Sequence, residues 1–221
     1  DWAWRARVNA VAALGDTAAA ARPAAEIAPP LPDSARQAEA WTRAGMLFLR
    51  AHRNEDAKEA FRKSIATSIG SGAAVDAARE LATVGTPTVA DQLKIGRVFL
   101  RHSNPVRAAT AFDAYFARGK PPVAERVAIQ LELGTALFNI RQYPGAERRL
   151  RAAVTAGANA TRARASVAQA LYMLGRSQYR RGATTTARTT FTRVVRDYPT
   201  TNAAARAHFT LGDIDHDANR L

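Results

Sequence analysis

The 221-residue sequence contains no cysteine. Disulfide bonds, thiolate zinc sites and thiol-based catalysis are therefore excluded, although export to an oxidising compartment stays compatible with the sequence. No stretch of about 18 apolar residues occurs, so the chain is not expected to span a membrane. The sequence begins at Asp1 without an initiator Met or an apolar leader, which predicts a processed product or a fragment.

Aromatic residues are also scarce, with three Trp, five Tyr and eight Phe. The hydrophobic content of 47% is dominated by alanine, which favours close packing of helices over a thick sheet core. The length allows one large domain or two small ones with a buried core. An all-α fold is therefore predicted.

Acidic residues are few: 19 oppose 32 basic residues, and from Arg148 to Arg196 the sequence has 11 Arg and neither Asp nor Glu. A segment of this kind carries a positive field that favours anionic partners, such as acidic peptides, nucleic acid, phosphate-bearing polymers or lipid head groups. A solvated arginine-rich surface without a dedicated ligand explains the same composition, and both interpretations stay open.

One pattern recurs four times along the chain. A glycine at helical spacing among apolar residues is followed after 12 residues by an alanine, and after four more by Phe or Leu. A fifth copy begins at His208, Leu211 and Gly212. The four complete sets are Gly45, Ala57 and Phe61; Gly96, Ala108 and Phe112; Gly134, Ala146 and Leu150; and Gly175, Ala187 and Phe191.

Each residue type in this pattern has a physical reason. Glycine inside a helix is about 1 kcal/mol less favourable than alanine, so its recurrence at one register indicates a close approach of two helices. The small alanine meets it, and the Phe or Leu one turn later fills the wider space. The pattern predicts antiparallel helical hairpins. The successive glycines lie 51, 38, 41 and 37 residues apart, and the longest gap leaves room for an extra helix over about residues 73–83.

The pattern resembles the tetratricopeptide repeat, which reads W-x2-L-G-x2-Y, then A-x3-F, then P. Residues 170–199 match it closely, although Tyr179 lies one residue late. The resemblance implies an all-α, right-handed solenoid of about four repeats and a truncated last one over residues 33–221. Residues 1–32 are predicted to form an irregular helical hairpin, because Pro23 interrupts its second helix. A Pro-rich link through Pro29, Pro30 and Pro32 follows it.

These irregular alanine- and arginine-rich hairpins are also similar to the superhelical part of bacterial soluble lytic murein transglycosylases and to periplasmic tetratricopeptide scaffolds. That resemblance implies a periplasmic or cell-envelope location. In the transglycosylases the catalytic domain carries a Glu-Ser motif followed by a Gly-Leu-Met-Gln run, and neither occurs here. The favoured function is a non-enzymatic protein-interaction scaffold. The alternative is the helical portion of a transglycosylase, with peptidoglycan as its partner and catalysis outside this chain.

Other chemistry is not indicated by the sequence. The four histidines are scattered, and no phosphate-binding loop or nucleophile-bearing turn occurs, so no catalytic residue or cofactor is predicted. The cluster Asp213, Asp215, His216 and Asp217 could in principle hold a divalent metal, but a polar terminal helix explains the same residues without one, and no metal site is predicted. Nucleic acid is not favoured as a partner, because no recognised nucleic-acid motif accompanies the basic segment.

In stacked hairpins the first helices line the concave side, so residues off the Gly/Ala seam are expected to face a groove. Arginines recur there at repeat spacing and could clamp carboxylates. We expect an extended protein or peptide segment, of acidic character, as the ligand. Alternatively, the tyrosines pack the hairpins and the arginines are solvated. The predicted groove residues are Arg50, Arg97, Arg101, Tyr172, Arg176, Tyr179 and Arg180.

Overall fold

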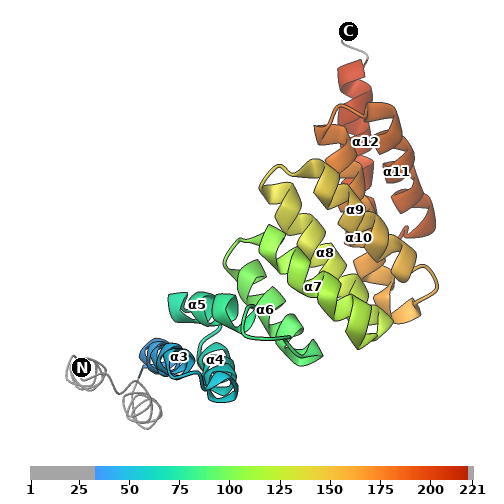
Figure 1. Cartoon of the computed structure of the whole chain (residues 1–221). Helices are drawn as coiled ribbons and strands as arrows, with labels where there is room; N and C mark the ends of the chain where they lie inside the picture. Colours follow the sequence, from blue (N-terminus) through green and yellow to red (C-terminus); the bar gives the residue numbers. More distant parts are fainter. Residues whose placement is uncertain (1–32, 219–221) are drawn as a thin grey trace. The chain divides into compact units, whose positions relative to one another are not determined.

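The computed structural model describes residues 33–218, and every regular element in that range is helical (Figure 1), which confirms the all-α prediction. The hairpin and link predicted for residues 1–32 lie outside the described residues. The chain divides into two compact units, one ending at Arg118 and the other beginning at Gly119. The N-terminal unit contains α3 (Ser34–Arg50), α4 (Asn54–Thr67), α5 (Gly72–Leu81), α6 (Val89–Arg101) and α7 (Pro105–Gly119). The C-terminal unit contains α8 (Val123–Asn139), α9 (Tyr143–Ala156), a 3-10 turn (Thr161–Ala163), α10 (Arg164–Arg180), α11 (Thr184–Asp197) and α12 (Asn202–Ala218).

The recurring glycine marks a packing seam inside each hairpin. It lies on the first helix, and the Phe or Leu 16 residues later projects from the second helix against it. A Cβ added to Gly175 would lie only 2.7 Å from the ring of Phe191, so nothing larger than glycine fits without a shift. Ala187 is fully buried beside it. The same contact joins Gly45 to Phe61, Gly96 to Phe112 and Gly134 to Leu150.

The turn within each hairpin is also repeated. The residue seven positions after the seam glycine adopts a positive φ in all four copies, and the next amide donates a hydrogen bond back to the carbonyl five residues earlier. This is the glycine-type termination of a helix, which satisfies the last carbonyls of the first helix. The four residues are His52 (φ 57°), Ser103 (φ 55°), Arg141 (φ 62°) and Gly182 (φ 81°).

The extra helix predicted for the longest gap is α5, which begins at Gly72 and ends at Leu81. It packs against α3, α4 and α6 of its unit. An ion pair also links α4 to α6: Arg62 donates two hydrogen bonds, both 2.8 Å, to the carboxylate of Asp91. Asp91 and Thr88 form a capping box at the start of α6. Burial opposes ionisation of Asp91, but hydrogen bonds from Arg62 and Thr88 outweigh it and lower its pKa to about 2.

The core of the C-terminal unit runs through both of its hairpins and into α12. Helix α10 packs against α8, α9, α11 and α12, so it occupies the centre of the unit. Small residues of α12, among them Ala204 and Ala207, complete the core at the end of the unit. The first helices α8, α10 and α12 therefore lie next to one another, and their shared surface is available for a site.

Candidate functional site

The predicted groove residues of the C-terminal unit lie on α10. We call the surface that α8, α10 and α12 present outside the Gly/Ala seam the first-helix face. Tyr172 is buried in it, Arg176 is half-buried, and Tyr179 and Arg180 are exposed. The seam fixes this arrangement: burial of Gly175 against Phe191 sets the rotation of α10, which leaves Tyr172 packed against Phe191 and directs Arg176 and Arg180 toward α8.

Arginines and aromatic rings alternate across the first-helix face. The guanidinium carbon of Arg176 lies 4.8 Å from the ring centre of Phe138 on α8 and 6.0 Å from that of Tyr172. The guanidinium carbon of Arg206 on α12 lies 4.6 Å from the ring centre of Tyr172. We call these four residues the arginine–aromatic ladder. The ring of Tyr172 packs against that of Phe191, with their centres 5.7 Å apart. The ladder is therefore in direct contact with the hairpin seam.

The arginines of the face differ from those of the second helix in their electrostatic partners. All three arginines of α11 pair with carboxylates: Arg188 with Asp215, and both Arg193 and Arg196 with Asp197. Among residues 33–218, no carboxylate lies within ion-pair distance of Arg176, Arg180 or Arg206. The three arginines of α11 thus share two carboxylates, whereas Arg176, Arg180 and Arg206 on the first-helix face have none within the described residues.

A cavity of about 460 Å³ opens next to the ladder. It lies where α8 turns into α9, and Arg180 reaches it from α10. The rings of Phe138 and Tyr143 pack together in its wall with their centres 5.5 Å apart. Asn139 and Arg141 complete the lining. The cavity thus combines guanidinium and amide donors with apolar ring surface, which suits a side chain with a carboxylate and an aliphatic stem.

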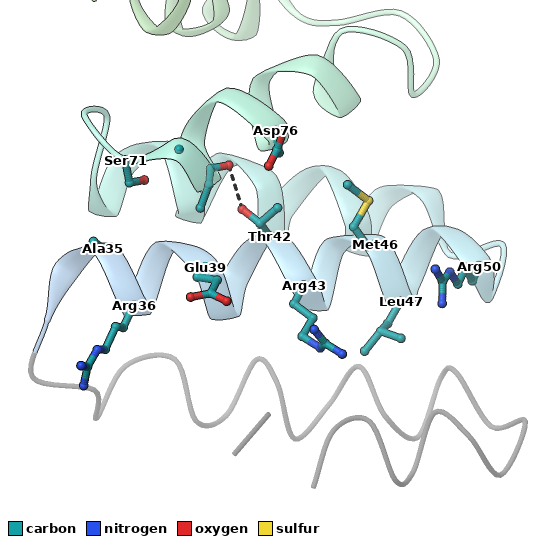
Figure 2. A pocket seen from close by; sticks show the side chains of 12 residues that line it. Ala35, Arg36, Glu39, Thr42, Arg43, Met46, Leu47, Arg50, Ser71 and Asp76 are labelled. Atoms are coloured by element: carbon teal, nitrogen blue, oxygen red, sulfur yellow. Dashed lines mark hydrogen bonds between the residues drawn. The ribbon is translucent and has the colours of Figure 1, made fainter. Parts of the chain in front are cut away.

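The predicted residue of the first repeat, Arg50, lines a different cavity in the N-terminal unit. This cavity holds about 680 Å³ and is lined by α3 and the start of α5 (Figure 2). The hydroxyl of Thr42 donates a hydrogen bond of 3.1 Å to the carbonyl of Ala73, and Met46 and Asp76 lie beside it between the two helices. Acidic Glu39 and Asp76 accompany Arg36, Arg43 and Arg50 in the lining, so this cavity is mixed in charge.

Helix α5 changes the surroundings of the remaining predicted residues. Because α5 packs against both α3 and α6, an additional helix stands between the first helices of the first two repeats. Arg97 and Arg101 are exposed on α6, and Arg101 lies against Gly70 in the loop before α5. Neither of them lines the cavity that contains Arg50. The N-terminal residues therefore form no cluster comparable to the arginine–aromatic ladder.

Three residues of the first-helix face were missed from the sequence: Phe138, Arg206 and Phe209. Phe138 follows its seam glycine by four residues, as Tyr179 does, and Arg206 and Phe209 precede Gly212 by six and three residues. Phe209 is 73% exposed on α12. Repeat register could have found Phe138 and Phe209, because it aligns them with Tyr179 and Tyr172, but it gives no signal for Arg206.

The described residues show no group of three or more metal-ligating side chains. In the acidic cluster of α12, Asp213 and Asp215 are exposed, and Asp215 pairs with Arg188. The Nε2 atom of His102 lies 3.1 Å from the carbonyl oxygen of Ile69, while His52 occupies a turn. Within residues 33–218 no helix combines the length and the apolar character needed to cross a membrane.

Fold and site together define a repeat protein built from helical hairpins. A tetratricopeptide-repeat family model matches residues 93–161, and a second one matches residues 169–201. These two segments are therefore similar to tetratricopeptide repeats. A solved structure described as the nearly identical TPR-like repeats of a putative kinesin light chain from Podosopora anserina shares 14% sequence identity with this chain. The match covers 87% of this chain and 91% of the other, with a TM-score of 0.39. The comparison with curated proteins finds no match.

Proposed function

We propose that this chain is a non-enzymatic protein-interaction scaffold whose C-terminal unit binds an extended, acidic peptide segment along the first-helix face. Tetratricopeptide repeats present extended binding surfaces for protein partners, which supports the general class. The observation that supports an acidic ligand is the difference between α10 and α11. Arg176 and Arg180 lack a carboxylate partner within the described residues, whereas every arginine of α11 has one.

The ladder prepares its arginines for such a ligand. Contacts with the rings of Phe138 and Tyr172 restrain the Arg176 guanidinium. Its Nη1 donates to the sulfur of Met173, which leaves Nε and Nη2 as donors for a ligand. A carboxylate can then accept two parallel hydrogen bonds while the arginine loses little conformational entropy. Arg180 offers a second donor group one helical turn further along α10, at the 460 Å³ cavity. Two acidic side chains of one extended peptide could therefore be bound together.

The test begins with a peptide library displayed on phage and selected with the full chain, which should enrich sequences containing Asp and Glu. The dissociation constant of one selected peptide is then measured by fluorescence anisotropy for two double variants. Arg176→Ala with Arg180→Ala should weaken binding about tenfold or more. Arg193→Ala with Arg196→Ala removes the same charge from α11 and should change the dissociation constant less than about twofold.

Equal losses in the two double variants would show that only net charge matters and would contradict a site on the first-helix face. Selection of peptides without acidic residues would contradict the ligand chemistry. Binding should also weaken with rising salt, because exposed carboxylate–guanidinium contacts are screened. Circular dichroism on both variants controls for unfolding.

The alternative function, the helical portion of a lytic transglycosylase, assigns peptidoglycan to the same face and the bacterial envelope as its location. It rests on the resemblance of the alanine- and arginine-rich hairpins to those proteins. Peptide stems of peptidoglycan also carry carboxylates, so the same double variants test whether peptidoglycan binds to the first-helix face. Co-sedimentation of the chain with purified sacculi, lost on changing Arg176 and Arg180, would support this alternative over a protein ligand. Binding to acidic peptides without binding to sacculi would exclude it.

A further inference from the structure

A further cavity, of about 370 Å³, lies in the N-terminal unit beside the extra helix α5. The last turn of α5 forms one of its sides, and α6 and α7 form the others. Its floor is made by Ile95, Phe99 and Ala111, all of which are buried. It shares no lining residue with the cavity that contains Arg50. We call it the α6–α7 cavity.

The length of α5 explains why this space is open. In both units the helix before a hairpin packs on the first helix of that hairpin, α9 on α10 and α5 on α6. Helix α9 has 14 residues, whereas α5 has only 10. The shorter helix leaves part of the second hairpin uncovered, and the α6–α7 cavity lies where α5 ends.

Repeat register shows which side chains are missing from the cavity. Gln92 and Ala114 line it, and the first hairpin has Trp41 and Lys63 at the same positions relative to its seam glycine. There the ammonium of Lys63 lies 4.7 Å from the centre of the Trp41 ring. An aromatic ring with a charged group beside it therefore occupies this place in the first hairpin. In the second hairpin the chain supplies neither.

The charge at the cavity is positive. Two arginines and no carboxylate are among its lining residues. Arg79 pairs with Asp76 at 2.9 Å on α5. The guanidinium carbon of Arg107 lies 5.6 Å from the ring centre of Phe99, and within residues 33–218 no carboxylate forms an ion pair with Arg107. Arg107 is therefore the cation that a ligand in this cavity can pair with.

We propose that the α6–α7 cavity binds an aromatic side chain of a protein partner that has an acidic residue next to it in sequence. The ring rests on Ala111 and Ala114, and the neighbouring carboxylate accepts hydrogen bonds from Arg107. Aromatic side chains inserted into pockets contribute much of the affinity of protein interfaces. This site is separate from the first-helix face, because all of its residues belong to the N-terminal unit.

The test uses the capped dipeptide acetyl-Trp-Glu-amide and the full chain with ¹³C-labelled alanine methyl groups. In NMR titrations the methyl signals of Ala82, Ala111 and Ala114, which line the cavity, should shift with a dissociation constant of about 0.1–1 mM. Acetyl-Gly-Glu-amide lacks the ring and should leave these three signals unchanged up to about 10 mM. Shifts at other alanines alone, or equal shifts with both dipeptides, would overturn the inference.

A second comparison tests the charged contact. Acetyl-Trp-Gln-amide should bind the wild type about tenfold more weakly than acetyl-Trp-Glu-amide, because the carboxylate is lost. In Arg107→Gln the two dipeptides should bind equally, with the weaker constant. Arg118→Gln is the matched control: Arg118 is also exposed on α7, but it donates to the carbonyl of Pro87 and does not line the cavity. It should keep the tenfold difference. A tenfold difference that persists in Arg107→Gln, or disappears in Arg118→Gln, would contradict pairing with Arg107.

A filled cavity tests the location of the ring. Gln92→Trp combined with Ala114→Lys places the ring and the cation of the first hairpin in the second one, so it should weaken binding of acetyl-Trp-Glu-amide more than tenfold. Undiminished binding by the folded double variant would overturn the inference. Circular dichroism checks its fold. Because Arg107 and Arg118 are both exposed, their comparison stays decisive even if the filled variant unfolds.

Discussion

The seam inside each hairpin and the first-helix face obey different rules, although both lie on the same helices. The seam is the same in both units: a buried Phe or Leu covers a glycine at Gly45, Gly96, Gly134 and Gly175. The face differs between them. In the C-terminal unit it carries stacked arginines, whereas in the N-terminal unit α5 packs on α3 and the adjoining cavity mixes acidic and basic side chains.

The repeat pattern specifies the packing of the seam but does not specify the side chains of the first-helix face. A seam glycine and the Phe or Leu that covers it belong to one hairpin, so their contact does not depend on the neighbouring repeats. The face is built from positions that no neighbouring backbone constrains, and its side chains are free to specify a ligand. Stability should therefore depend on the seam and binding on the face, which the following variants test in order of expected effect.

Removing the ring that fills a seam should have the largest effect. Phe191 is fully buried between Gly175 and Tyr172, so Phe191→Ala leaves a cavity and should lower the free energy of unfolding by about 3–5 kcal/mol. Phe209→Ala makes the same chemical change at an exposed position and should alter it by less than about 0.5 kcal/mol. Urea denaturation at low protein concentration measures both. Similar losses would contradict the division between seam and face.

Asp91→Asn breaks a contact between hairpins and should have the next largest effect. The pKa of Asp91 is lowered from 3.8 to about 2, so its ionised form contributes about 2 kcal/mol of stability at neutral pH. This contribution is complete above about pH 4 and is lost as the pH falls through about 2. The wild type should exceed the variant by about 2 kcal/mol at pH 7, and the difference should shrink in acid. A constant difference from pH 7 to pH 2 would show that the Arg62–Asp91 pair is not its source.

Replacing the glycines themselves should change the free energy of unfolding by a smaller amount, and in opposite directions at Gly175 and Gly212. Gly175→Ala forces a methyl group against Phe191 and should destabilise the chain by about 1–2 kcal/mol, after the gain in helix propensity is included. Gly212→Ala meets no neighbour and should stabilise α12 by up to about 1 kcal/mol. Thermal unfolding of the two variants gives the comparison. Destabilisation by both would contradict the open space beside Gly212.

The hairpins and the extra helix could be predicted because their signals are local. Gly175, Ala187 and Phe191 recur at fixed spacing, and the 51-residue gap revealed α5 to within two residues at either end. The face could be predicted only in part. Arg176 follows from register, but its contact with Phe138 joins residues of two different repeats, 38 positions apart, and composition gives no sign of it. Nor does the sequence separate Arg176 from Arg188, since the carboxylate that neutralises Arg188 comes from α12.

The turns should give the smallest effect, and they test whether the seam dictates backbone geometry as well as packing. Ser103 and Gly182 occupy the same turn position with positive φ, but only glycine adopts it without steric conflict. Ser103→Gly should therefore stabilise the N-terminal unit by up to about 1 kcal/mol, and Gly182→Ala should destabilise the C-terminal unit by about 1 kcal/mol. Both are read from urea denaturation curves. If Gly182→Ala were neutral, the turn would follow from the hairpin contacts alone, because the seam would then hold any residue in the left-handed conformation without a measurable loss of stability.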